Sequence, residues 1–345
     1  MKKYAYIRAL ASALPKRIED NAALPPRYRH KLGIEERHLA ADDEAASDLA
    51  ATAAERLFSR HGVDRSGIDF LLVCTQTPDH AMPSTSCLLQ KKLSLSRHCG
   101  ALDLNLGCSG YVYGLALAKG LLETGMAHRL LLITVSTLTK CVSREDRATW
   151  PLFGDAAAAT LLETREAEEP LLSAFAFGTD GAGYDSIIIP AGGSRSPMKT
   201  TPVEHIVDAP GSSRTNYDVY MNGMEVASFT LDTVPSLVEE VLQRGSITRQ
   251  QLDGCIFHQA NRFLLEYLQK KCDLMEVPYY NDIRHTGNTV ASTIPLAIER
   301  LCAEGADVRG FRHVLLAGFG VGFSWAGCLA DLRALSDESW EEQHG

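Results

Sequence analysis

Gly62-Val63-Asp64-Arg65-Ser66-Gly67-Ile68-Asp69 is a turn-rich stretch that leads directly into an apolar run, Phe70 to Thr75. The second half of the chain has the same arrangement, because Gly245 to Asp253 precedes the apolar run Gly254 to Phe257. Glycine, serine and aspartate favour turns, and a short apolar run after a turn is typical of a buried strand. The sequence therefore predicts a turn followed by a strand at equivalent places in two halves.

The spacing of two later apolar runs supports this internal repeat. Asp69 and Asp253 are separated by the same number of residues as the starts of the runs Arg129–Ile133 and His313–Ala317. The runs are continuously apolar rather than alternating, as in sheet strands that are buried on both faces. We therefore expect two related α/β halves packed against each other, each built in the order helix, turn, strand, helix, strand, helix, strand.

Length and composition are those of a globular protein with more than one core unit. The chain has 345 residues, of which 45% are hydrophobic and 22% charged, and this length exceeds that of one ordinary domain. We predict a first half over residues 1–165 and a second over residues 166–345. The net charge of −9 argues against a nucleic-acid binder. The turn-rich region Ala191 to Asn216 is interpreted as an insertion rather than a domain boundary.

Cysteine use and the N-terminus predict a cytoplasmic protein. The nine cysteines are spread without a framework spacing and include no Cys-x-x-Cys pair or paired Cys/His spacing, so we expect reduced thiols and no metal site. Arg8 lies where the apolar core of an export signal would be, so we expect no export signal. No uncharged apolar run reaches the roughly 18 residues that a membrane span needs.

Cys108 is the strongest candidate for a reactive group. It lies in Leu104-Asn105-Leu106-Gly107-Cys108-Ser109-Gly110, between a strand-like run (Ala101 to Leu106) and a helix-like stretch (Tyr111 to Gly125). Free N–H groups and the positive end of the helix dipole at such a junction favour thiolate over thiol. A single cysteine is more often an inert buried residue, but the small neighbours leave room for a ligand.

Two more junctions add polar groups. An apolar strand ends in His258, ahead of a predicted helix from Phe263 to Lys271, and Asn288 lies in a Gly-Asn-Thr turn before another helical stretch. Taken singly, such a histidine is usually structural and such an asparagine is usually a turn or cap residue. Three places where a strand or loop meets a helix start together supply Cys, His and Asn, which favours a catalytic site between the two halves.

In sequence order, these motifs resemble the 3-oxoacyl-(acyl-carrier-protein) synthase III family of the thiolase-like superfamily. The resemblance covers nearly the whole chain. Its segments are Gly33–Ala40, Thr77–Thr85, Gly107–Leu115, Leu152–Ala159, Met221–Val226, His258–Asn261, Gly287–Thr289 and Gly318–Trp325.

The resemblance implies a five-layered α-β-α-β-α fold made of two similar halves, in a homodimer. It implies decarboxylating Claisen condensation of an acyl thioester with malonyl-acyl carrier protein, in fatty-acid or specialised lipid and polyketide biosynthesis. Cys108 would accept the acyl group, while His258 Nε2–H and the Asn288 amide would stabilise the enolate. Backbone N–H groups at Cys108 and near Val321 would form the oxyanion hole. Acyl-CoA and acyl carrier protein are the implied partners, and no metal or redox cofactor is implied.

Substrate-binding residues are expected at several basic positions. Arg27, Arg29 and Lys31 occupy the segment where the family often has a tryptophan for the adenine of CoA, and they are candidates for phosphate contacts. Arg262, Lys270 and Lys271 are candidates for docking the acidic carrier protein. Met82 lies in the loop that, in the family, reaches the acyl pocket of the partner subunit, and ordinary core packing is the alternative for it.

Other functions remain open at this level. One is acyl transfer to an oxygen or nitrogen acceptor, although relatives with that activity often lose the asparagine that this chain retains. A second is a non-catalytic subunit that binds acyl carriers, and a third, less favoured, is a cysteine hydrolase. The sequence does not specify the acyl group, or whether CoA or a carrier protein delivers it.

Overall fold

The two turns of the internal repeat make the same contacts in the computed structural model, which describes residues 2–304 and 308–336. The Asp69 N–H donates to the Arg129 carbonyl at 3.1 Å, and the Asp69 carboxylate accepts from the Arg129 N–H at 3.0 Å. Asp253 and His313 form the same pair of hydrogen bonds, at 3.0 and 2.7 Å. Each aspartate thus joins the start of one strand to the start of the next, which confirms the repeat.

The first half forms a five-stranded sheet in the order β1-β7-β6-β4-β5. Pairs β4–β6 and β4–β5 are parallel, whereas β7 is antiparallel to both of its neighbours. The bounds are β1 (Lys2–Ala13), β4 (Phe70–Cys74), β5 (Gly100–Leu104), β6 (Arg129–Ser136) and β7 (Ala156–Ala167).

The second half forms a four-stranded sheet in the order β13-β14-β15-β8. Its strands are β8 (Leu172–Thr179), β13 (Gly254–Phe257), β14 (Val314–Gly320) and β15 (Ser324–Ala330). The sequence predicts a further strand in this half, equivalent to β5, and that prediction is wrong. The described chain has only an isolated bridge there, between Cys255 and Tyr279.

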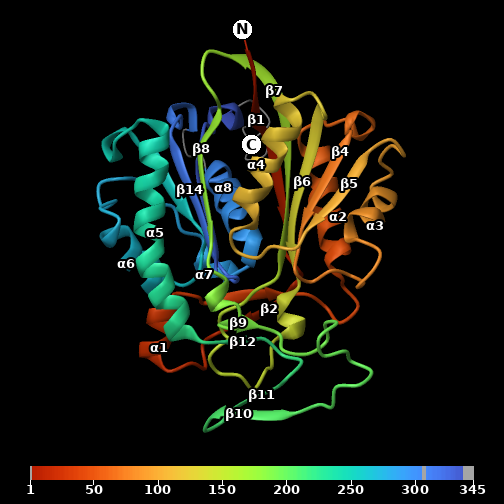
Figure 1. Cartoon of the computed structure of the whole chain (residues 1–345), viewed down its shortest axis with the longest axis vertical. Helices are drawn as coiled ribbons and strands as arrows, with labels where there is room; N and C mark the ends of the chain where they lie inside the picture. The colour runs from red at the N-terminus through yellow and green to blue at the C-terminus, as the bar shows by residue number, and fades with distance from the viewer. Residues whose placement is uncertain (1, 305–307, 337–345) are drawn as a thin grey trace.

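Helices complete the layers (Figure 1). Two helices lie between the sheets, α4 (Gly110–Glu123) and α8 (Thr293–Ala303), and contact strands of both. The outer face of the first sheet is covered by α2 (Ala46–Arg60) and α3 (Thr85–Lys92), and that of the second by α5 (Gly223–Gly245) and α6 (Arg262–Lys271). The predicted five-layered fold is therefore confirmed.

Burial follows from this layering. Strand β6 is buried along almost its whole length, because helices cover both of its faces. Strand β5 differs, since Ala101 and Leu102 are exposed at the edge of the first sheet. Asp103 interrupts the apolar residues of β5, and the exposed Leu102 is one of the large apolar side chains that the described chain leaves uncovered.

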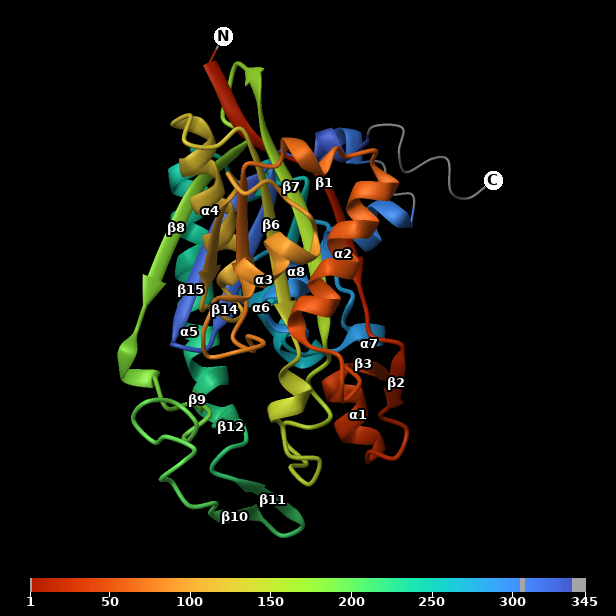
Figure 2. The same ribbon diagram turned by 90° about the vertical axis from the view of Figure 1, so that its right-hand side faces the viewer.

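Short strands and helices lie together at one end of the molecule, beside loops that connect the strands of the two sheets (Figure 2). They are β2 (Arg17–Asp20), β3 (Glu36–Leu39), β9 (Ile187–Ile188), β10 (His205–Ala209), β11 (Ser212–Thr215), β12 (Tyr220–Met221), α1 (Pro26–Leu32) and α7 (Ile283–Thr286). The predicted insertion contains the β10–β11 hairpin. The last strand of the first sheet ends at Ala167 and the first strand of the second begins at Leu172.

Three chemical features are plain in the described residues. All nine cysteines lie among them as free thiols. Within the same ranges, no three His, Cys, Asp or Glu side chains are arranged to hold a metal ion. Of the helices described, none combines the length and the apolar character that crossing a membrane requires.

Candidate active site

Cys108 lies between β5 and α4, and two glycines of the other half let β14 approach it. A Cβ atom added at Gly318 would lie 2.6 Å from the Cys108 carbonyl oxygen. One added at Gly320 would lie 2.9 Å from Cys108 Sγ. Any side chain at either position would collide with the cysteine. The end of β14 therefore forms one wall around the Cys108 sulfur.

The protonation of Cys108 differs from the sequence prediction. The residue is buried, and burial raises the pKa of its thiol to about 12. Backbone N–H groups of Val321 and Cys108 itself act in the opposite direction and lower this pKa. Desolvation outweighs them, so the resting sulfur is a neutral thiol rather than the thiolate expected at a helix start. The same two N–H groups are those predicted to form the oxyanion hole.

His258 lies at the end of β13, beside the strand that touches Cys108. Its N–H donates to the Ala317 carbonyl of β14 at 2.8 Å, one residue before Gly318. Its ring meets the Phe319 ring edge-on at 5.8 Å between centroids. Burial lowers the pKa of His258 to about 3, so the imidazole is neutral.

Thr293, at the start of α8, holds the other side of this imidazole. His258 Nδ1 and Thr293 Oγ1 are 2.8 Å apart, and the Thr293 hydroxyl also donates to the Val290 carbonyl at 3.1 Å. A hydroxyl both donates and accepts, so it supports either ring tautomer. If the imidazole proton is on Nδ1, Nε2 can accept a proton as a base. If the proton is on Nε2, Nε2 can donate a hydrogen bond. Nothing in the sequence marks Thr293, because only the fold brings it to His258.

Asn288 is fixed by its backbone and by one side-chain contact. Its N–H donates to the Leu152 carbonyl and its own carbonyl accepts from the Gly154 N–H, both at 3.0 Å. Asn288 Oδ1 accepts from the Val290 N–H at 2.9 Å. This bond occupies the amide oxygen, so the side chain presents its NH₂ group as a donor.

Val290 connects the predicted site residues. Its N–H binds Asn288, its carbonyl accepts from the threonine that bonds His258, and its side chain packs in the same apolar cluster as Cys108. Val290 has φ of 57°, which is a strained conformation for a β-branched residue. Strain of this kind is characteristic of functional sites. The structure thus joins three side chains that the sequence places at separate junctions.

Four of the predicted binding residues lie on helix α1 or at the start of helix α6. Arg27, Arg29 and Lys31 lie on α1, and Arg262 begins α6. A Cβ added at Gly33, which caps α1, would lie 2.3 Å from Arg262 Cβ, so the two helices are in close contact there. Arg262 also forms an ion pair with Glu266, one turn along its own helix.

The remaining predicted binding residues lie elsewhere. Lys270 and Lys271 are at the far end of α6, about 12 Å along the helix from Arg262. Lys271 is held by the Leu231 carbonyl and Asp232 of α5. Met82 is 82% exposed, so the core-packing alternative for this residue is wrong for the described chain.

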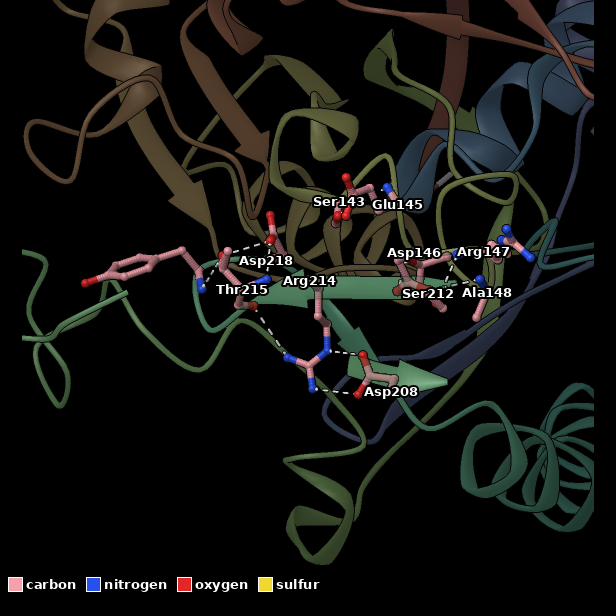
Figure 3. Close-up of polar contacts among 12 residues, drawn as sticks. Ser143, Glu145, Asp146, Arg147, Ala148, Asp208, Ser212, Arg214, Thr215 and Asp218 are labelled. Atoms are coloured by element: carbon pink, nitrogen blue, oxygen red, sulfur yellow. Dashed lines mark hydrogen bonds and ion pairs between the residues drawn. The ribbon is translucent and has the colours of Figure 1, made fainter. Parts of the chain in front are cut away.

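A cavity of about 500 Å³ lies near α1 rather than around Cys108. Its two arginines, Arg144 and Arg147, come from the loop before the Asn288-binding segment (Trp150–Gly154), and the hairpin β10–β11 supplies further lining residues. Figure 3 shows Arg147 of this loop beside Ser212 of the hairpin. Ser212 holds the hairpin to this loop through Asp146 Oδ1, at 3.2 Å. Tyr28 of α1 reaches the Arg147 carbonyl at 3.4 Å. In the sequence, the predicted insertion marks the hairpin side of this cavity and the charged run Ser143–Arg147 marks the loop side.

A two-sheet, five-layered fold with Cys, His and Asn side chains at the junction of its halves defines a thiolase-like enzyme. Models of the N-terminal and C-terminal parts of 3-oxoacyl-[acyl-carrier-protein] synthase III match residues 102–181 and 242–332. The chain belongs to this family of C–C bond-forming acyltransferases.

Individual relatives agree. The chain is 34% identical over 296 residues to beta-ketoacyl-[acyl-carrier-protein] synthase III of Caldanaerobacter subterraneus subsp. tengcongensis, with 86% of each chain covered. A crystal structure of a 3-oxoacyl-(acyl-carrier-protein) synthase III is 43% identical, with a TM-score of 0.91 over 95% of this chain and 99% of that one. A synthase from Burkholderia xenovorans LB400 is 33% identical, with a TM-score of 0.85 over 97% and 96%.

Proposed function

We propose that this protein condenses an acyl thioester with malonyl-acyl carrier protein through an acyl-Cys108 intermediate and releases CO₂. The observation that supports this most directly is the connection of Cys108, His258 and Asn288 through Val290. The product is a 3-oxoacyl thioester for fatty-acid or specialised lipid and polyketide biosynthesis. No step of this chemistry consumes a metal or redox cofactor.

In the first step, the Cys108 sulfur attacks the thioester carbonyl. His258 Nε2 takes the thiol proton, because the imidazole is neutral and its Nδ1–H is accepted by Thr293. The oxyanion is bound by the N–H groups of Cys108 and Val321. The carrier or CoA sulfur then leaves and takes the proton from His258, so the bond to Cys108 replaces the original thioester bond.

In the second step, malonyl-carrier protein loses CO₂, and its electron pair becomes an enolate. Between the two steps the imidazole exchanges its Nδ1 proton for one on Nε2 through solvent. The Asn288 NH₂ group and His258 Nε2–H then donate to the enolate oxygen, and the Thr293 hydroxyl donates to Nδ1. The enolate carbon attacks the acyl carbonyl and forms the C–C bond. The bond from that carbonyl to sulfur breaks, Cys108 leaves as a thiolate, and this thiolate takes a proton from solvent.

Substrate delivery is assigned to the basic end of the molecule. Arg27, Arg29, Lys31 and Arg262 would contact the phosphates of CoA or the acidic carrier protein. Lys270 and Lys271 would extend the carrier contact along α6, although they lie apart from that group.

We further propose a homodimer joined at β5, in a cytoplasm that keeps the cysteines reduced. An exposed edge strand that presents Leu102 is suited to pair with a second copy. Met82, exposed on the same half, would then contribute to the partner's acyl pocket. A Leu102→Lys variant tests this, because it should sediment as a monomer where the wild type sediments as a dimer.

The main test is intact-protein mass spectrometry with a panel of acyl-CoAs and acyl-carrier proteins. A gain of one acyl group, absent in Cys108→Ala, is expected, followed by 3-oxoacyl product when malonyl-carrier protein is added. Acyl transfer to an oxygen or nitrogen acceptor instead of malonyl-carrier protein would identify an O- or N-acyltransferase. The absence of acylation with every donor would favour a non-catalytic carrier-binding subunit.

A further inference from the structure

Arg37 of β3 is a charged side chain in the interior near Asn288. It is 1% exposed, and burial lowers the pKa of its guanidinium. Nη1 donates to the carbonyls of Trp150 and Phe153, at 2.6 and 3.0 Å, and Nη2 donates to Glu19 Oε1 at 3.1 Å. A buried arginine is costly to desolvate, so its retention calls for a specific role.

The two carbonyls that Arg37 binds belong to the segment that holds Asn288. Phe153 pairs with Asn288 as an isolated parallel bridge. Its neighbours Leu152 and Gly154 form the two backbone hydrogen bonds to Asn288 described above. Arg37 therefore binds one edge of this segment while Asn288 binds the segment through its own backbone.

Arg37 also restricts Asn288 through the residue before it, Gly287. A Cβ added at Gly287, the residue before Asn288, would lie 2.9 Å from Arg37 Cγ. Gly287 has φ of 66° and is thus in the left-handed region, which glycine adopts without strain. The stem of Arg37 consequently packs directly against the turn that presents Asn288.

Glu19 completes the arrangement from the neighbouring strand. Glu19 of β2 lies opposite Arg37 of β3 in the register of this pair. Its Oε1 accepts from Arg37 Nη2 and also from the Trp150 indole N–H, at 2.7 Å. The Arg37 guanidinium lies over the Trp150 ring, 5.3 Å from its centroid. One carboxylate oxygen therefore fixes both Arg37 and the first residue of the Asn288-binding segment.

We propose that Arg37, oriented by Glu19, is a positioning residue that holds Asn288 where it donates to the enolate in the condensation step. This inference rests on the proposed function and assigns a new role within it. Nothing in the described contacts of Arg37 reaches Cys108 or the backbone N–H groups around it. Loss of Arg37 should therefore impair condensation and leave acyl transfer to Cys108 intact.

The experiment measures the two half-reactions separately in the full-length enzyme. Acylation is followed by intact mass after mixing with the acyl donor. Condensation is followed after the preformed acyl enzyme is mixed with malonyl-carrier protein. The variants are Arg37→Lys, Asn288→Ala and the double variant. Arg37→Lys keeps the charge but loses the forked contact with two carbonyls and Glu19.

We expect Arg37→Lys to slow condensation by about 100-fold while acylation stays within about twofold of the wild type, because a small displacement of a catalytic group is costly. In the Asn288→Ala background, Arg37→Lys should cause no further loss. Equal loss in both half-reactions, or unchanged condensation in a folded variant, would overturn the proposal. A wild type that becomes acylated but never condenses would instead refute the proposed function.

Glu19→Gln keeps the experiment decisive if Arg37→Lys does not fold. Glutamine retains an acceptor oxygen but removes the charge that orients Arg37, so condensation should fall about tenfold and acylation should persist. Arg249→Lys is the matched control. Arg249 likewise binds a backbone carbonyl, that of Cys272, and an acidic side chain, Glu239, but lies outside the site. It should change neither half-reaction, and a similar split for Arg249→Lys would also overturn the proposal.

Discussion

Gly320 lies so close to Cys108 that a Cβ atom at this position would stand 2.9 Å from Sγ. Because the sulfur must move when it takes an acyl group, a methyl group here would crowd the reaction. We predict that Gly320→Ala slows acylation by at least about tenfold. Intact mass at timed intervals after donor addition measures this rate.

Gly120 provides the matched control for that substitution. It lies on α4, the helix that begins just after Cys108, and a Cβ there would meet nothing within 4 Å. Gly120→Ala should leave acylation unchanged and raise the free energy of unfolding by about 0.5–1 kcal/mol. A normal acylation rate in Gly320→Ala would show that β14 does not confine the sulfur.

The pKa of Cys108 predicts how its reactivity depends on pH. A thiol with a pKa of about 12 is almost fully protonated near neutrality, so its thiolate fraction rises about tenfold for each pH unit up to that value. Alkylation of the free enzyme by iodoacetamide should follow this slope between pH 7 and pH 10. Subtraction of the Cys108→Ala rate removes the contribution of the exposed Cys87. A plateau near pH 7 would instead support the thiolate that the helix start alone predicts.

Thr293 is expected to act through His258. Thr293→Val keeps the shape of the side chain and removes the hydroxyl that bonds Nδ1. Both half-reactions should slow by about tenfold, the value of one well-formed hydrogen bond. Stopped-flow or quenched assays of each half-reaction give these rates.

Thr230→Val is the comparison for Thr293. Thr230 is also a buried threonine whose hydroxyl donates to a carbonyl in its own helix, that of Val226. Its replacement should leave both rates intact. Loss of activity in both valine variants would indicate a general effect of removing a buried hydroxyl.

Replacement of Asn288 should impair condensation but not acylation. Asn288→Ala should lower condensation by about 100- to 1,000-fold, as expected when one oxyanion donor is lost, while acyl transfer to Cys108 continues. Asn222→Ala, which removes the cap of α5 that binds the Glu225 N–H, should reduce stability without this split. Acyl-enzyme accumulation in the presence of malonyl-carrier protein is the diagnostic readout for Asn288→Ala.

Much of the fold could be predicted from the sequence because a short turn motif recurs before equivalent strands. Asp69 and Asp253 lie at the ends of these turns, and each binds the start of the neighbouring strand in its own sheet. The strand predicted as the counterpart of β5 is absent from the described chain, in which Tyr279 pairs with Cys255 only as a single bridge. That outcome depends on packing between distant segments.

The site divides in the same way. Cys108, His258 and Asn288 could be proposed from the sequence because each lies where a strand or loop meets a predicted helix start. Thr293 and Arg37 could not, since their partners are distant in sequence and their side chains are common surface or helix residues in other settings. The thiolate prediction for Cys108 failed because a helix dipole is visible in a sequence, whereas complete desolvation is not.

The contacts of Val290 determine which amino acids can replace it, whether by design or by natural substitution. Its contacts with Asn288 and with Thr293 use the main-chain N–H and carbonyl, which every residue except proline offers. The hydrogen bonds at this position thus depend on backbone shape, whereas the apolar side chain supplies the packing in the cluster that contains Cys108. Glycine or asparagine, which tolerate the left-handed conformation better than valine, would keep the hydrogen bonds but lose this packing. A comparison restricted to side chains would therefore overlook the residue that joins the parts of the site.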